Sequence, residues 1–194
     1  MDASPVDRVV GHERAESLVA RLFGRGSGRY RHMVGAARAA QHAGGLLLEG
    51  EDLETLVNAA FLHDVGYAVP RTGFHSVDGA ELLLREGWPV RVASLVAHHS
   101  YARTVAPAAG RIAALARFPL ETGLVHDLLV YADMSVEPGG SSVLLEQRIA
   151  DIGRRHVGCT PTGEVHDERA AQLRAAVARV DGELARRYAP AVTA

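Results

Sequence analysis

The sequence predicts an all-α fold, and three observations lead to that prediction. Apolar residues recur at helical spacing over most of the 194 residues, whereas no stretch shows alternation long enough for a strand. Glycine and proline clusters fall between the periodic segments rather than inside them. The apolar content of 47% is ordinary for a globular protein with a core. We therefore expect residues 1–194 to form a single helical domain.

Five helices are expected in the first two thirds of the chain: residues 12–24, 29–45, 51–64, 76–87 and 89–100. The first stops at the glycine cluster GRGSG, and the second, which is rich in alanine, stops at paired glycines. The third opens with acidic residues, which suit a helix N-terminus. The fourth opens with a serine that can cap it, and the fifth has a proline in its first turn.

Three further helices are expected towards the C-terminus. Residues 121–136 are mostly apolar, which indicates a buried helix. Residues 143–157 and 167–189 are amphipathic and are separated by the loop GCTPTGEV. Their apolar faces either close the bundle or form a contact in a homodimer, and the sequence leaves both open.

The composition excludes several classes of function. A net charge of −2 gives no reason to expect a nucleic-acid partner, and no apolar run is long enough to span a membrane. All 21 basic residues are arginine, so mechanisms that need a lysine are absent. The lone cysteine, Cys159, excludes an internal disulfide, is expected to be structural and fits a cytoplasmic protein.

Side chains that can bind a metal ion recur at the ends or on the apolar faces of the expected helices: His32, His63, Asp64, His75, His98, His99 and Asp133. Imidazole and carboxylate groups that converge from several elements are typical of a divalent metal site. The other histidines are not part of such a set of potential ligands and are expected to be surface or capping residues: His12, His42, His126, His156 and His166.

The adjacent histidines at the end of residues 89–100 have different surroundings. His99 follows Leu95 by four residues and Val92 by seven, so it extends the apolar stripe of that helix. His98 lies nearer the edge of the stripe. We therefore favour His99 as a metal ligand, with His98 as a catalytic substrate contact or an additional ligand.

The order of these residues resembles the signature of the HD-domain metal-dependent phosphohydrolases. FLHDVGYA (61–68) looks like the central motif of that family, an apolar run followed by His-Asp-x-Gly. RYRH (29–32), HSVDGA (75–80), VAHHS (96–100) and ADMSVEP (132–138) are similar to motifs of its two-metal subgroup. Within it, the chain most resembles bacterial enzymes that cut dinucleoside tetraphosphates symmetrically. The resemblance implies an HD core at about 29–138 and a helical extension at 139–194.

The resemblance also implies how the ligands divide between two ions. His32, His63, Asp64 and Asp133 would surround one ion, and Asp64 would bridge to a second that His75 and His99 complete. A hydroxide held by the ions would be the nucleophile, with Asp64 and His98 as catalytic residues. One or two divalent ions are expected, iron or manganese first, with zinc, nickel, cobalt or magnesium as alternatives.

A small phosphorylated substrate needs positive charge nearby. Arg29 and Arg31 flank the first histidine, and Arg103 follows the double histidine, so these arginines are candidates to bind phosphate. Tyr67 stands where many family members have a lysine, and it is also a candidate substrate contact.

Two other functions remain open at this point. Some HD proteins with two irons are oxygenases that cleave C–C or C–P bonds, and certain of these carry a tyrosine and a glutamate before the first histidine. Here residues 22–30 contain Tyr30 but no acidic residue. The third possibility is a module that binds metal for stability and has no catalytic activity.

Overall fold

The protein is all-α, as the sequence predicts. This computed structural model describes residues 5–156, 158 and 162–188, with only the backbone described for residues 5–10. That part of the chain contains no β-strand, only an isolated bridge between Val136 and Ser142. No helix in it combines the length and hydropathy needed to cross a bilayer. Cys159 lies outside the described residues.

The described residues form ten α-helices and two short 3₁₀ helices. In chain order these are α1 (Pro5–Phe23), α2 (Gly28–Gly44), α3 (Gly50–Leu62), η1 (Val65–Ala68), α4 (His75–Arg85), α5 (Val90–His98), η2 (His99–Tyr101), α6 (Ala102–Val105), α7 (Ile112–Leu115), α8 (Leu124–Met134), α9 (Leu145–His156) and α10 (His166–Tyr188). Each of the eight expected helices is present, with ends shifted by a few residues, and α1 begins earlier than expected. The short helices η1, η2, α6 and α7 were not predicted.

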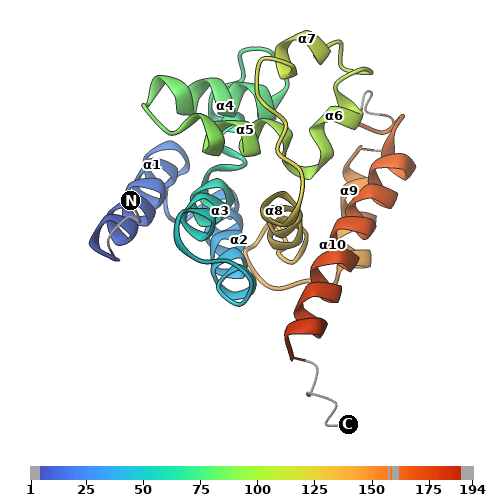
Figure 1. Ribbon diagram of the computed structural model, residues 1–194. Coiled ribbons are helices and arrows are strands. Elements are labelled where there is room, and N and C mark those ends of the chain that lie inside the picture. The colour runs from blue at the N-terminus through green and yellow to red at the C-terminus, as the bar shows by residue number, and fades with distance from the viewer. Residues whose placement is uncertain (1–4, 157, 159–161, 189–194) are drawn as a thin grey trace, which may run out of the picture.

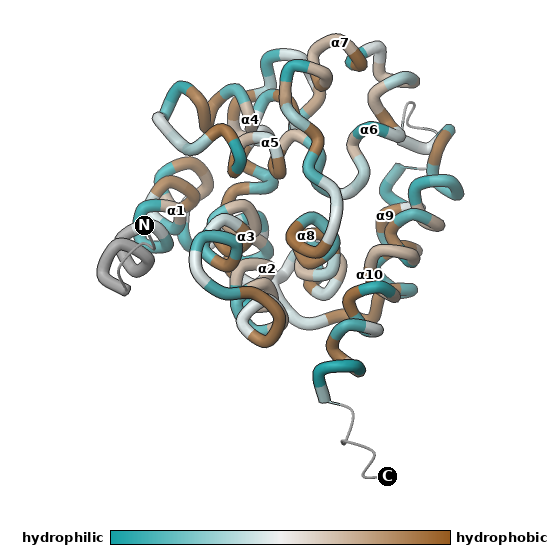
Figure 2. The backbone as a smooth tube through the Cα atoms, in the orientation of Figure 1, coloured by the Kyte–Doolittle hydropathy of each residue, from teal (hydrophilic) through white to brown (hydrophobic). Residues whose placement is uncertain are grey.

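Helix α8 lies in the middle of the bundle, with α2 and α3 on one side and α9 and α10 on the other (Figure 1). Its sequence is mostly apolar, and Figure 2 shows it as a hydrophobic element surrounded by other helices. Helices α4 and α5 pack against each other, and α5 also packs on α3. The central position of α8 explains why its one buried carboxylate near the C-terminal end, Asp133, faces several other elements.

The two C-terminal helices are joined to the bundle by a separate hydrophobic cluster. Val130 and Met134 of α8 pack there with Ile149 and Ile152 of α9 and Leu173 of α10, all of them buried. The apolar faces of α9 and α10 are therefore used within the chain, to close the bundle over α8.

The segment expected as one helix at 89–100 breaks at His99. His99 has ψ of 153°, and Ser100 and Tyr101 have φ of 53° and 56°, in the left-handed region that non-glycine residues rarely adopt. Periodicity cannot reveal such a break, because the apolar pattern continues up to it. The break turns the chain away from α5 and into α6.

A close backbone approach places η1 against the start of α4. Gly66 lies so near α4 that a Cβ atom there would collide with the carbonyl oxygen of His75 and lie 2.6 Å from the amide nitrogen of Gly79. Only glycine allows this approach. It brings His75 next to Asp64, which precedes η1. The expected serine cap of this helix is wrong, because α4 begins at His75 and Ser76 is buried inside it.

Candidate metal centre

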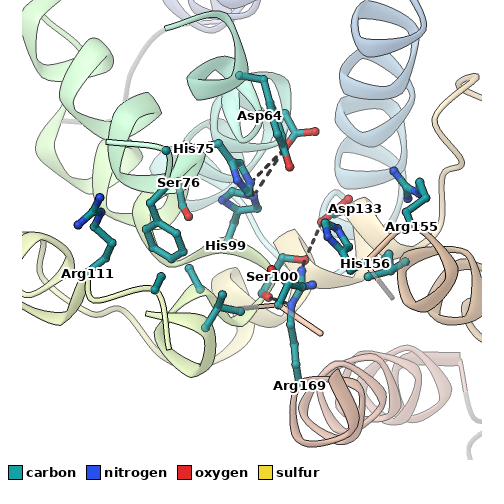
Figure 3. A pocket seen from close by; sticks show the side chains of 18 of the residues that line it. Asp64, His75, Ser76, His99, Ser100, Arg111, Asp133, Arg155, His156 and Arg169 are labelled. Atoms are coloured by element: carbon teal, nitrogen blue, oxygen red, sulfur yellow. Dashed lines mark hydrogen bonds and ion pairs between the residues drawn. The ribbon is translucent and has the colours of Figure 1, made fainter. Parts of the chain in front are cut away.

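The structure brings together the six residues that the sequence favours as metal ligands: His32, His63, Asp64, His75, His99 and Asp133. They come from α2, the end of α3, the start of α4, the end of α5 and α8. Figure 3 shows four of them, Asp64, His75, His99 and Asp133, around one cavity. Their side chains are buried except for that of His75, which is partly exposed.

Three of the ligands form a first triad at His32, His63 and Asp133. The Nε2 atom of His32 lies 3.2 Å from both Asp133 Oδ1 and His63 Nε2. His63 Nε2 lies 3.7 Å from the same Asp133 oxygen. Two imidazole nitrogens and a carboxylate oxygen therefore point at one small volume.

The second triad consists of Asp64, His75 and His99. The Nε2 atoms of His75 and His99 are 3.2 Å apart and lie 3.6 and 3.7 Å from Asp64 Oδ1. The other oxygen of Asp64, Oδ2, lies 3.5 Å from His63 Nε2 and 4.0 Å from His32 Nε2. Asp64 therefore presents one oxygen to each triad.

The imidazole rings are oriented by their other nitrogen atoms. His63 Nδ1 lies 2.8 Å from the carbonyl oxygen of Ala60, and His99 Nδ1 lies 2.6 Å from that of Val96. A carbonyl accepts but cannot donate, so both Nδ1 atoms carry the proton. In the neutral form of each ring the Nε2 lone pair then faces its triad, the arrangement seen at metal-binding histidines.

Burial and mutual proximity shift the ionisation of the cluster. Burial alone would lower the pKa of His63, but the carboxylates of Asp64 and Asp133 outweigh it and raise that pKa to about 9. Burial and the neighbouring imidazole of His99 lower the pKa of His75 to about 3. Although burial opposes it, the positive groups around them hold the pKa of both aspartates well below the usual range.

These residues fit divalent metal ions. Four imidazoles and two carboxylates without thiolate are a donor set for borderline and hard divalent cations. The two triads share Asp64, and the second oxygen of Asp133 accepts a hydrogen bond of 3.0 Å from Ser100 Oγ, which fixes that carboxylate in place. His32, His63 and Asp133 would hold one ion, His75 and His99 another, and Asp64 would contact both.

A cavity of about 410 Å³ opens beside the two triads. Arg29 and Tyr67, two of the candidate substrate contacts, are among the residues that line it. Arg29 bonds to Asp64 Oδ2, and its guanidinium carbon lies 4.1 Å above the ring of Tyr67. Tyr67 in turn stacks on His75, with ring centroids 4.1 Å apart, so the pair forms one wall of the site.

The structure places three of the expected residues away from this cavity. His98 Nε2 lies 3.0 Å from the carbonyl oxygen of Phe118, and His98 lines a different cavity together with Arg103. Arg31 donates to the backbone oxygens of Gly26 and Gly139. The catalytic role of His98 and the phosphate contacts of Arg31 and Arg103 are therefore corrected. The break after His98 directs only His99 to the cluster, and Arg31 binds loops instead.

Several residues that line the cavity were not foreseen, among them Ser100, Arg148 and Arg169. Ser100 belongs to the unpredicted left-handed turn, and the two arginines lie beyond residue 138, where the sequence motifs end. One histidine assignment was also wrong, because His126 is buried edge-on against Tyr101. His156 lies at the end of α9, as expected of a helix-end residue, and also lines the cavity. Only the tertiary packing of α8, α9 and α10 reveals these positions.

Metal affinity is expected to rise with pH. A protonated imidazole cannot bind a metal, and the pKa of His63 is about 9, so an incoming ion must displace its proton at neutral pH. One displaced proton makes the apparent affinity rise by about tenfold per pH unit below that pKa. Calorimetry in buffers of different ionisation enthalpy measures this directly. Proton release that is absent at pH 7 and an affinity that is flat from pH 6 to 8 would contradict it.

Comparison with known proteins agrees with the geometry. Residues 29–152, well over half of the chain, match the family described as HD domain. Searches of curated proteins and of solved structures return no significant match. The matched region begins at Arg29, next to His32, and contains all six residues of the two triads. The chain therefore belongs to the HD domain family.

Proposed function

We propose that this protein is a metal-dependent phosphohydrolase that cleaves a small phosphate ester or anhydride, such as a nucleotide. The observation that supports this most is the position of Asp64. Its two oxygens face two separate imidazole groups, at 3.5 Å and 3.6 Å, on the wall of an arginine-lined cavity. Paired cation sites of this kind are suited to displacement at phosphorus.

One or two divalent ions are the proposed cofactors. When bound, they supply Lewis-acid activation of a water molecule and of a phosphoryl oxygen. We propose iron or manganese, because histidine and carboxylate donors without thiolate suit these metals; zinc, cobalt, nickel and magnesium are the alternatives to test.

Two side chains around the cluster can bind the substrate while keeping their own protonation state. Burial raises the pKa of Tyr67 to about 12, so its phenol remains a neutral hydrogen-bond donor at physiological pH. The guanidinium of Arg29 lies over that ring, with the carboxylate of Asp64 beside it. The two residues can therefore donate hydrogen bonds to an anionic substrate without taking up or losing a proton.

The proposed substrates are nucleotide-sized. A cavity of about 410 Å³ lies within the common range for small-molecule sites. The resemblance of the sequence motifs to symmetrical dinucleoside-tetraphosphate hydrolases makes those compounds the first substrates to test. We propose a small soluble molecule as the partner, rather than nucleic acid or a membrane.

A substrate panel tests the proposal. Protein loaded separately with iron, manganese, zinc, cobalt, nickel or magnesium is assayed for phosphate release. The panel covers nucleoside monophosphates, nucleoside triphosphates and dinucleoside polyphosphates. We expect hydrolysis of at least one class, with inorganic phosphate as an inhibitor. No hydrolysis of any class with any metal would reject the proposal.

The oxygenase alternative has little support at this site. Tyr30, the only tyrosine in residues 22–30, bonds through its hydroxyl to Glu16 and Arg25 and is not among the residues that line the cavity. Oxygen consumption by the iron-loaded protein with candidate substrates would revive it.

Replacing His75 by alanine separates catalysis from a purely structural metal site. His75 is the one partly exposed ligand, with 29% of its side chain accessible, so its loss creates little buried cavity. We expect loss of one metal equivalent and of hydrolysis, with a fall in melting temperature of only a few degrees. Elemental analysis and thermal denaturation measure these. Unchanged hydrolysis in the variant would point to a structural site.

A further inference from the structure

Helices α9 and α10 contribute further arginines to the lining of the cavity, and Figure 3 shows the one on α10, Arg169, beside Ser100. Arg148 extends from α9 and Arg169 from α10. Neither was predicted from a motif, and no part of the proposed metal site requires a guanidinium group there. Their contacts show what these charges can bind.

Arg148 is buried, with only 6% of its surface exposed, yet its hydrogen bonds are incomplete. Its Nη2 atom lies 3.4 Å from Asp133 Oδ1, and its Nη1 atom lies 3.6 Å from Asp151 Oδ2. The Nε and Nη1 groups have no hydrogen-bond partner within the described residues. A buried guanidinium whose Nε and Nη1 groups make no hydrogen bond carries a desolvation cost that its two carboxylate neighbours offset only in part.

Arg169 is fixed in place without a carboxylate partner. Its Nε donates to the carbonyl oxygen of Ser100 at 2.7 Å, and its Nη2 donates to Ser100 Oγ at 2.9 Å. Among the described residues it makes no ion pair, and burial lowers its pKa from the usual value. An arginine remains charged despite such a shift, so the cavity contains a desolvated positive charge held rigidly by neutral groups.

Both arginines are linked to the metal cluster by contacts to Asp133, directly for Arg148 and by way of Ser100 for Arg169. Arg148 contacts the oxygen of Asp133 that faces His32, and Arg169 contacts Ser100, which donates to the other oxygen. An anion placed beside the cluster would therefore lie within reach of both guanidinium groups.

The charge of the whole cavity favours an anion. Its lining includes five arginines and only two carboxylates, those of Asp64 and Asp133. The arginines are Arg29, Arg111, Arg148, Arg155 and Arg169. Arg29, Arg148 and Arg155 are paired with Asp64, Asp133 and Asp151, whereas Arg111 and Arg169 make no ion pair among the described residues. The lining therefore keeps an excess of positive charge beside the metal site.

We propose that Arg148 and Arg169 form an oxyanion clamp, which holds the non-bridging oxygens of the phosphoryl group attacked at the cluster. The helical extension thereby contributes the anion-binding half of the active site. This inference rests on the proposed phosphohydrolase function.

Binding of inorganic phosphate to the metal-loaded protein tests the clamp without relying on turnover. We compare the wild type with Arg148→Gln and Arg169→Gln. The matched control is Arg174→Gln, because Arg174 lies on α10 but pairs with Glu146 at the surface, outside the cavity. We expect phosphate affinity to fall about 10- to 100-fold in each cavity variant, the usual cost of a lost charged hydrogen bond. The control should bind like the wild type, and metal content should be unchanged in all.

Turnover gives a second measure once a substrate is known. Removing one donor that stabilises developing negative charge typically lowers kcat by roughly 10²-fold, and we expect a loss of that size for each glutamine variant. Arg148→Lys and Arg169→Lys keep the charge but lose the planar fork, so they should fall between glutamine and arginine. If a glutamine variant does not fold, the phosphate affinity and kcat of the corresponding lysine variant test the clamp instead.

Two results would overturn the clamp. One is equal phosphate affinity in the wild type and both cavity variants, and the other is failure of the metal-loaded wild type to bind phosphate. Failure of the proposed function looks different. In that case the loaded protein binds phosphate through these arginines but hydrolyses no phosphate ester.

Discussion

Replacing Asp64 by asparagine is expected to abolish hydrolysis and to reduce the metal content below one ion per chain. Asp64 presents one carboxylate oxygen to each triad, with Oδ2 3.5 Å from His63 Nε2 and Oδ1 3.6 Å from His75 Nε2. Asparagine keeps the shape but removes the negative charge that both ions need. Since metal ions contribute several kcal/mol of transition-state stabilisation, kcat should fall by about 10³-fold or more.

Asp127→Asn is the matched control for this variant. Asp127 is also a buried aspartate, but it pairs with Arg179 in a different cavity. We expect the control to lose some stability and to keep its metal content and hydrolysis. Full metal binding by Asp64→Asn, measured by elemental analysis after dialysis, would contradict the bridging position.

Replacing Gly66 by alanine is expected to have the largest effect on folding. A Cβ at this position would meet backbone atoms of α4, at the carbonyl oxygen of His75 and at the amide nitrogen of Gly79. Backbone cannot move aside as a flexible side chain can, so we expect a loss of about 3 kcal/mol, at the upper end for overpacking. For a chain of this size, that corresponds to a fall in melting temperature of about 6–12 °C.

Gly26→Ala is the control for Gly66→Ala. No atom lies within 4 Å of a Cβ added at Gly26. Its melting temperature should stay within a few degrees of the wild type. The close approach at Gly66 places η1 against His75. The alanine variant should therefore also bind a metal ion more weakly at the triad of Asp64, His75 and His99. A melting temperature equal to that of the control would show that η1 and α4 are not in this close contact.

The helical architecture could be predicted from the sequence because helices are marked by local sequence signals. Apolar spacing, glycine stops and acidic first turns located each of the longer helices. The break at His99 has no such signal in the sequence, because Ser100 and Tyr101 are not residue types that favour a left-handed conformation. Their conformation accompanies hydrogen bonds from Arg169 and to Asp133, which are distant in the sequence.

The candidate metal ligands could be picked out because their types and order form a motif. The preference for His99 over His98 agrees with its place in the cluster, but for a different reason. His99 reaches the cluster as the residue that caps α5, not as part of its apolar stripe. The anion-binding side could not be predicted in this way. Arg148 and Arg169 are two among 21 arginines, and only the packing of α9 and α10 on α8 distinguishes them from surface residues such as Arg31.

A metal titration tests most directly whether six distant residues form one two-ion centre. Purified protein is stripped of metal, titrated with manganese and with iron under anaerobic conditions, and compared with the His32→Ala and His75→Ala variants. The account predicts two equivalents for the wild type and loss of one in each variant, because each histidine belongs to a different triad. A wild type that binds neither ion, or variants that bind as much as the wild type, would contradict it.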